Sequence, residues 1–271
     1  MSQSGVSRAL ARLEEEVGAA LLRRSGRTLR MTEAGAVFKR HVDGLIHQLD
    51  DGLAAVQQVV DPESGTIALA FDPWLGSRWV PALLSTFRTE HPSVRFRLVT
   101  QQVGTHGTLH RGDVDVEVTA SRPSPAQYGW HAIGREQLRL VVPRSHRFAE
   151  FSSVSFASLE DEAFVAPRSG SALREITDRV CLEAGFPPRV EFECDHLAAV
   201  HGFVAAGLGI AITPLLGQPE KAPEAALQFT PLTGVSAAIE IGVTWSLERR
   251  LLPAATAFLS HVREGKELHR A

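Results

Sequence analysis

The chain has 271 residues and a formal net charge of −3, enough length to bury a sizeable core in one or more domains. No stretch is long and apolar enough to span a bilayer, and the N-terminus has no apolar secretory core. Two cysteines without an export signal favour a cytoplasmic protein. The histidines lack paired metal spacing, and no nucleophile elbow, phosphate loop or dinucleotide fingerprint occurs. The sequence therefore indicates neither an enzyme nor a cofactor or metal.

Residues 2–18 predict an amphipathic helix that a serine caps at its start and Gly18 ends. Its apolar stripe recurs at helical spacing and consists of Val6, Leu10, Leu13 and Val17. The opposite side, near the N-terminal end, carries groups that pair with bases or phosphates in a major groove. These candidate DNA-binding residues are Ser2, Gln3, Ser4, Ser7 and Arg8.

A basic turn and a short alternating strand follow, with Arg24 and Arg27 beside a glycine. Eight basic and four acidic residues in the first forty give this end a net charge of +4, which leaves −7 for the remainder. A basic end on an acidic body is typical of a protein with one end that contacts phosphates.

Residues 2–35 resemble the winged helix-turn-helix of LysR-type transcriptional regulators. The shared marks are the serine-rich helix start, the Leu-Glu-Glu pattern that ends in glycine, the Leu-Leu-Arg-Arg turn and the Thr-Glu-Ala-Gly start of the next helix. Leu22 and Met31 replace the family's usual phenylalanine and leucine. The resemblance implies that Arg8 contacts promoter DNA and that Arg24 and Arg27 hold the wing to the DNA backbone.

In that family two further helices precede the recognition helix, and they are not in this sequence. The apolar stripe of residues 2–18 then loses the surface that it normally covers, at roughly 1.5 to 3 kcal/mol per large side chain. We expect that Met1 is an internal methionine or that the chain is shortened, and that this short form binds DNA weakly. A stop codon directly upstream would contradict a misplaced start. The alternative is then an interaction module without DNA affinity.

Thr32 begins a long helical pattern whose apolar residues recur at spacings of three and four. They are Phe38, Val42, Leu45, Leu49, Leu53, Val56 and Val60. Such a stripe suits pairing with a second helix. In the family this segment is the linker helix that joins two subunits, and effector domains associate further into a tetramer. We therefore expect a partial winged helix-turn-helix over 1–31, a dimerisation helix over 32–60, and a hinge at 61–65.

Residues 64–271 predict an α/β domain in which short apolar strands alternate with helices. We expect strands at 66–71, 94–100 and 114–119 with helices at 77–89 and 104–111, which predicts a mostly parallel sheet with right-handed crossovers. A second unit has strands at 138–142, 163–166, 189–193 and 210–213 with helices at 172–184 and 196–206. A strand at 239–245 and a helix at 253–262 return to the first unit.

This portion also resembles the family, whose effector domain has two periplasmic-binding-protein-like lobes joined by two crossing strands. The matching marks are Trp79-Val80-Pro81, Gly112-Asp113-Val114-Asp115 and the run from Val204 to Pro214. Lobe I is expected over about 64–140 and 241–271, and lobe II over about 141–240. A solute-binding protein is the alternative, because its lobes are similar, but such a protein carries a secretory signal.

In open α/β sheets a ligand binds where strands end and helices begin. The candidate effector-binding residues at these junctions and at the crossing between the lobes are Asp72, Trp74, Ser77, Gln102, Thr119, Ser121, Ser169, Asp195 and His196. Helix capping is the alternative role for the serine, threonine and aspartate residues. Asp72 disfavours a simple carboxylate unless Arg168 or His196 offsets its charge, so the small-molecule effector stays open.

Cys181 lies on a predicted helix among apolar residues, which favours a buried, unreactive thiol. The alternative is a redox switch like that of peroxide-sensing relatives. Such a switch requires an exposed thiol in electropositive surroundings.

Overall fold

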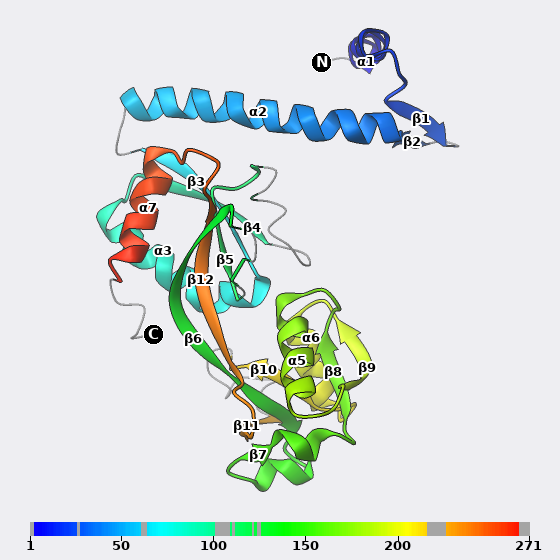
Figure 1. Ribbon diagram of the computed structural model, residues 1–271, viewed down its shortest axis with the longest axis vertical. Coiled ribbons are helices and arrows are strands. Elements are labelled where there is room, and N and C mark those ends of the chain that lie inside the picture. Colours follow the sequence, from blue (N-terminus) through cyan, green and yellow to red (C-terminus); the bar gives the residue numbers. More distant parts are fainter. Residues whose placement is uncertain are drawn as a thin grey trace. The chain divides into compact units, whose positions relative to one another are not determined.

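The computed structural model describes residues 3–25, 28–60, 64–100, 109, 112–120, 122–123, 126–215 and 226–265. The chain forms two compact units, Met1–Val56 and Gln57–Ala271. Figure 1 shows the helices and strands of both units.

Unit 1 contains two helices and a hairpin. Helix α1 (Gln3–Val17) ends at Gly18, whose φ of +71° lies in the region that glycine tolerates best. Strands β1 (Leu22–Ser25) and β2 (Thr28–Met31) pair antiparallel, and α2 (Glu33–Val60) follows. The predicted helix over 2–18, the wing and the long helix are therefore present.

Local polar contacts hold the hairpin between the two helices. The Glu14 carboxylate accepts hydrogen bonds from the backbone N–H groups of Leu21 at 2.7 Å and Leu22 at 3.0 Å. The Thr32 hydroxyl donates to the Ala20 carbonyl and accepts from the Gly35 N–H at 3.0 Å, which caps α2. A Cβ at Gly35 would lie 2.1 Å from the Leu21 carbonyl oxygen, so only glycine permits this close approach.

Unit 1 has almost no hydrophobic core. Among its described side chains, Leu21 is the only buried apolar one that is larger than glycine. On α1, Val6 is 51% exposed, and the α2 stripe is open as well, with Leu49 at 65%. The other exposed members of that stripe are Leu45, Leu53 and Val56. Unit 1 therefore presents two apolar helix faces that its own residues do not cover.

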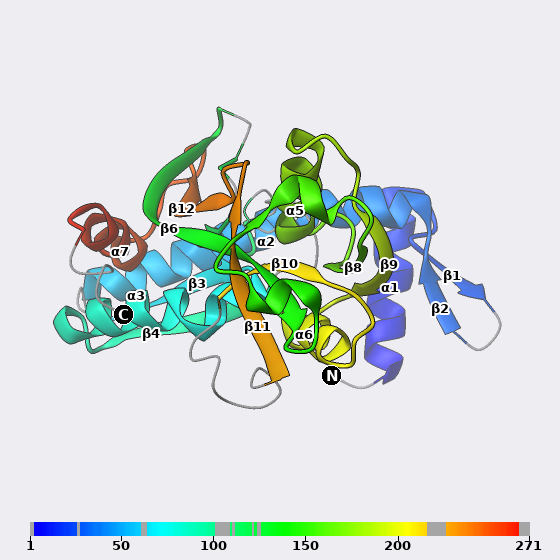
Figure 2. The ribbon, with the colours of Figure 1, turned by 90° about the horizontal axis from the view of Figure 1, so that it is seen from below.

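Unit 2 begins with three parallel strands. Strand β3 (Gly65–Phe71) lies between β4 (Val94–Thr100) and β5 (Val116–Thr119). The 3-10 helix η1 (Pro73–Ser77) and helix α3 (Trp79–Glu90) connect β3 to β4. Helix α7 (Pro253–Arg263) packs next to α3 (Figure 2), and both contribute to the apolar core beneath β3.

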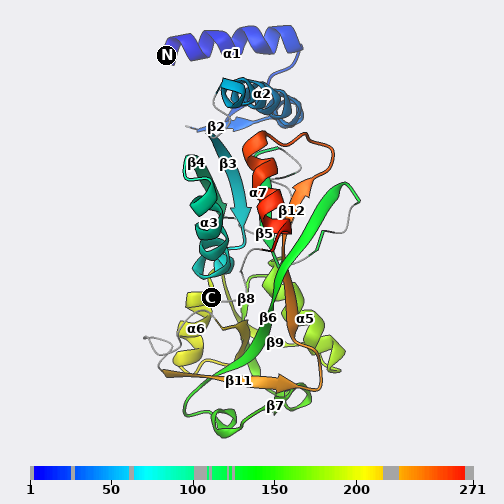
Figure 3. The ribbon, with the colours of Figure 1, turned by 90° about the vertical axis from the view of Figure 1, so that its left-hand side faces the viewer.

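Two long antiparallel strands connect the lobes of unit 2. Strand β12 (Ala238–Ser246) pairs with β5 and with the first part of β6 (Tyr128–Pro143). Beyond Gln137, β6 changes partners and pairs with β10 (Ala211–Pro214) and β11 (Leu227–Thr233). Figure 3 shows β6 extending from the lobe with α3 and α7 to the lobe with α5 and α6. The predicted pair of crossing strands is therefore present.

Lobe II is built around a second parallel pair, β8 (Ala163–Pro167) and β9 (Arg189–Cys194). Helices α5 (Ala172–Glu183) and α6 (Leu197–Ala205) follow these strands. The short elements η2 (Arg147–Glu150), β7 (Val154–Ser155) and η3 (Phe156–Leu159) complete the lobe, with β7 parallel to β11.

Several boundaries differ from the prediction. The strand predicted at 138–142 is part of β6, which begins ten residues earlier, at Tyr128. Strands β7 and β11 were not predicted, because each contains polar residues and β11 also contains a proline. The parallel arrangement is confirmed for β3, β4 and β5, but the sheet continues with antiparallel β12 and β6. The predicted helix at 104–111 lies outside the described residues except for Leu109.

Candidate DNA-binding and effector-binding sites

The described DNA-binding candidates lie on the surface of unit 1. Ser7 and Arg8 are exposed on the first turns of α1, and Arg24 is exposed on β1. Gln3 and Ser4 belong to α1, although the structure describes only their backbone, and Ser2 and Arg27 lie outside the described residues. The three described side chains are therefore accessible to a large polyanion.

The lobe I junction lies at the carboxyl end of β3. The Asp72 carboxylate accepts a hydrogen bond from the Ala120 N–H at 3.3 Å, which ties the ends of β3 and β5 together. The Ser77 hydroxyl donates to the Trp74 carbonyl at 2.9 Å and so stabilises η1. Both contacts are structural, but neither is the helix cap of the capping alternative, because the Asp72 side chain makes no cap bond to η1 and Ser77 lies at the end of η1. Thr119 is buried at the end of β5.

Trp74 differs from its neighbours in this junction. Its side chain is only 8% exposed, yet its indole N–H has no hydrogen-bond acceptor among the described residues. A buried donor without a partner costs about 1 to 3 kcal/mol, so a ligand atom that accepts from it would gain affinity. Gln102 and Ser121, which are predicted near this junction, lie outside the described residues.

In lobe II, two junctions lie side by side because β8 and β9 are parallel neighbours. The Arg168 N–H donates to the Cys194 carbonyl at 3.0 Å, and the Arg168 guanidinium pairs with Asp195 at 3.1 Å. Ser169 and His196 are exposed. The His196 carbonyl accepts from Ala199 and Val200 at the start of α6 while its ring makes no capping bond. The structure thus brings together the three predicted residues of lobe II.

The charge at this edge is largely compensated within lobe II. Arg174 pairs with Asp178 at 2.8 Å and with Glu193 at 2.5 Å. The hydrogen bond from Arg174 lowers the pKa of the Glu193 carboxyl. Burial by itself lowers the pKa of Arg174, but the hydrogen bonds to both acids raise it overall. Sequence reasoning missed Arg174, since Glu193 is nineteen residues away and no local pattern connects them.

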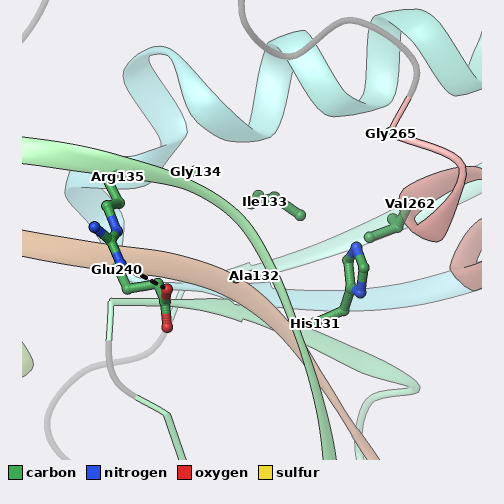
Figure 4. Close-up of a pocket in the computed structure, with 8 residues that line it drawn as sticks. All are labelled: His131, Ala132, Ile133, Gly134, Arg135, Glu240, Val262 and Gly265. Carbon is green, nitrogen blue, oxygen red and sulfur yellow. Dashed lines mark ion pairs between the residues drawn. The ribbon is translucent and has the colours of Figure 1, made fainter.

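A cavity of about 380 Å³ lies elsewhere, on lobe I (Figure 4). Its charged groups compensate each other, because Arg135 and Glu240 on neighbouring strands form an ion pair at 3.8 Å. None of the predicted effector residues lines it. The lining residues are His131, Ala132, Ile133, Gly134, Arg135, Glu240, Val262 and Gly265.

Both cysteines are buried, as predicted for Cys181. Burial, with a smaller contribution from Asp178, raises the pKa of the Cys181 thiol to about 12. Burial and Asp195 raise the pKa of Cys194 as well. These thiols are therefore poor nucleophiles, which disfavours the redox alternative.

Among the described residues, no group of His, Cys, Asp or Glu is placed to hold a metal, and no helix could cross a membrane.

Comparison with known families identifies both units. Residues 1–36 match the bacterial regulatory helix-turn-helix protein, lysR family, and residues 61–267 match the LysR substrate binding domain. The chain belongs to the LysR family of transcriptional regulators. This confirms the resemblance, the α/β architecture and the interpretation as a regulator and not an enzyme. The helix-turn-helix match also favours a regulator over a solute-binding protein.

The chain is similar to LysR-type regulators over nearly its whole length and to an effector-binding domain over three quarters of it. The HTH-type transcriptional regulator YybE of Bacillus subtilis is 31% identical, over 97% of this chain and 89% of its own. The structure of full-length CbnR complexed with target DNA aligns with a TM-score of 0.77 and 22% identity, over 98% of this chain and 91% of that one. The effector binding domain of QuiR in complex with shikimate aligns with a TM-score of 0.68 and 20% identity, over 75% of this chain and 98% of that one.

Proposed function

We propose that this LysR-type regulator binds promoter DNA through α1 and the β1–β2 wing, and that an effector held between its lobes modulates this binding. Arg8 and Ser7 contact the major groove together with Ser2, Gln3 and Ser4, while Arg24 and Arg27 contact the backbone. The exposure of Ser7, Arg8 and Arg24 supports this assignment. The structural likeness to CbnR, which was solved with its target DNA, supports it further.

The working form is a homodimer through α2, and effector domains associate further into a tetramer. The uncovered α2 stripe supports the dimer, because a second copy of the same helix would bury it. In this proposal, residues 1–31 bind DNA, 32–60 dimerise and 64–271 bind the effector. We place the site of action in the cytoplasm.

The effector-binding proposal rests on one observation, the buried indole N–H of Trp74 in η1, which has no hydrogen-bond partner among the described residues. We place an acceptor oxygen of the effector against it, with Asp72, Ser77, Gln102, Thr119 and Ser121 on the lobe I side. Ser169, Asp195 and His196 contribute from lobe II. Asp195 already pairs with Arg168, so the charge of Arg168 is largely compensated within lobe II. A small polar metabolite is therefore expected, in the size class of the shikimate bound to QuiR.

A thermal-shift screen of the full chain tests the effector site. A metabolite panel that includes shikimate is compared on wild type and on Trp74→Phe, which removes the N–H and keeps most of the ring. A ligand that stabilises wild type should lose about 1 kcal/mol or more of binding free energy in the variant. Trp245→Phe, at an equally buried tryptophan on β12, is the matched control. Equal stabilisation of both variants by that ligand would refute the role of Trp74.

Footprinting on the DNA upstream of this protein's own gene tests the proposed DNA-binding surface of α1. Arg8→Ala should weaken binding and reduce the slope of log affinity against log salt by about 0.9 if one phosphate contact is lost. Arg12→Ala is the control on the same helix, since Arg12 pairs with Glu16 at 3.0 Å. An unchanged salt slope and affinity for Arg8→Ala would reject its assignment.

A further inference from the structure

Arg78 lies at the turn between η1 and α3, one residue after the predicted effector residue Ser77. Its φ and ψ of −139° and −60° are not helical, while its carbonyl accepts the first hydrogen bond of α3, from Ala82 at 3.1 Å. Any displacement of η1, which carries Trp74, therefore passes through Arg78 before it reaches α3.

The Arg78 side chain extends to the crossing strand β6. Its Nη2 donates to Glu136 Oε2 at 2.6 Å, and the indole N–H of Trp79 donates to the same oxygen at 3.1 Å. The Arg78 guanidinium also lies over the Trp79 ring, 5.0 Å from its centre. Glu136 is only 8% exposed, so these two donors replace hydrogen bonds that water makes to an exposed carboxylate.

The contact with β6 is also close at the backbone. A Cβ at Gly134 would lie 2.3 Å from the Trp79 ring, so glycine lets the ring rest directly on the strand. Trp79 thereby contacts β6 at Gly134 and at Glu136, two positions that lie on the same face of this strand.

Glu136 lies where β6 passes from one lobe to the other. It pairs with Ile239 of β12, and the next residue, Gln137, pairs with Ala238. From Leu138 onward the partner of β6 is β10, with β11 joining at Arg139. A rotation of one lobe against the other must bend β6 near this change of partner, because hinge motion concentrates at the ends of elements.

We propose that the Arg78–Glu136 ion pair couples the effector junction to the interlobe hinge. Arg78 and Glu136 are positioning residues that do not touch the effector. The pair holds β6 in one orientation relative to η1, and an effector that moves η1 changes that orientation. This inference rests on the proposed effector site, since it names how a movement of η1 at that site reaches β6.

Distances between spin labels test the coupling without a ligand. Labels are placed at Ser85→Cys on α3 and Glu160→Cys in lobe II, both of which are exposed. The native thiols are buried and react poorly. Labelled subunits of the full chain are diluted with unlabelled ones, so that distances within one subunit dominate.

Arg78→Met and Glu136→Gln should each broaden the interlobe distance distribution by about two-fold or shift its centre, because each removes one partner of a pair whose carboxylate is buried. Arg78→Lys keeps the charge and should narrow the distribution again. The matched control is Arg147→Met. Arg147 pairs with Glu162 at 2.7 Å and lies over the Phe148 ring, but all three residues belong to lobe II.

Distributions for Arg78→Met and Glu136→Gln that equal those of wild type and Arg147→Met would overturn the proposal. If one of these two variants fails to fold, the other still tests the ion pair. If the lobes loosen but the promoter footprint of Arg78→Met stays identical to wild type, the regulatory part is wrong. Failure of every metabolite in the thermal-shift screen would instead count against the effector site and leave these distances unaffected.

Discussion

The two units of this regulator differ in how they bury apolar residues. Unit 2 places large side chains such as Phe87, Phe164 and Phe258 completely inside the fold. Unit 1 buries Leu21 and leaves helical stripes of valine and leucine open. Since burial of a large apolar side chain contributes roughly 1.5 to 3 kcal/mol, unit 2 can fold on its own residues, whereas unit 1 depends on surfaces supplied from outside itself.

The difference shows that apolar residues serve two purposes in this chain. In unit 2 many apolar residues lie at consecutive buried positions of short strands such as β3 and β5, and they pack into internal clusters. In unit 1 they follow helical spacing and specify a contact with another helix. Polar contacts such as those of Glu14 and Thr32 maintain the shape of unit 1, but they contribute only about 1 kcal/mol each.

The largest expected effect is a core truncation in unit 2. Phe258→Ala removes a fully buried ring that packs edge-on against Phe87 at 5.2 Å. The free energy of unfolding should fall by about 3 to 5 kcal/mol in denaturant titrations. Phe151→Ala, at an exposed phenylalanine, should change it by less than about 1 kcal/mol. Similar losses for both variants would contradict the described core.

A truncation on α2 should act on assembly instead. Leu49→Ala should raise the dimer dissociation constant by about ten- to a hundredfold in sedimentation equilibrium, since both copies lose buried area. The unfolding of unit 2 should remain unchanged. Arg40→Ala, which is exposed on α2 outside the stripe, should leave the dissociation constant close to that of wild type. A dimer insensitive to Leu49→Ala would mean that a different surface covers the stripe or pairs the subunits.

High pH should weaken unit 2 through Cys181. Its thiol has a pKa of about 12 in the fold against an ordinary value of 9.0, so the unfolded chain loses this proton first. The stabilisation is complete below pH 9 and is lost as pH rises toward 12, by about 1.4 kcal/mol per pH unit. Because other groups also titrate there, the slope is compared with that of Cys181→Ala. Equal slopes would show that the buried thiol contributes nothing.

The smallest effect is expected on the surface of unit 1. Arg12 and Glu16 form an exposed pair one turn apart on α1. Arg12→Ala should change stability by about 0.5 kcal/mol or less in thermal unfolding, because solvent screens such pairs. A loss above 1 kcal/mol would indicate that Arg12 also packs against a partner surface of α1.

The sequence by itself determined the elements whose signal is local. The period of Val6, Leu10, Leu13 and Val17, the glycine at 18 and the cap at Thr32 predicted α1, the wing and α2, because helix spacing and capping act within a few residues. The strand–helix alternation predicted both lobes and the junctions that bring Arg168 beside Asp195.

Only the tertiary structure decided how distant segments meet. The early start of β6 and the existence of β11 follow from pairing with strands far along the chain, which no local pattern encodes. The Arg78–Glu136 pair joins residues 58 positions apart, and the Trp74 indole N–H is buried without an acceptor among the described residues because of how the fold surrounds it. Burial and pairing depend on the whole fold, so spacing and composition could place Trp74 at the junction but could not predict the environment of its N–H or the Arg78–Glu136 pair.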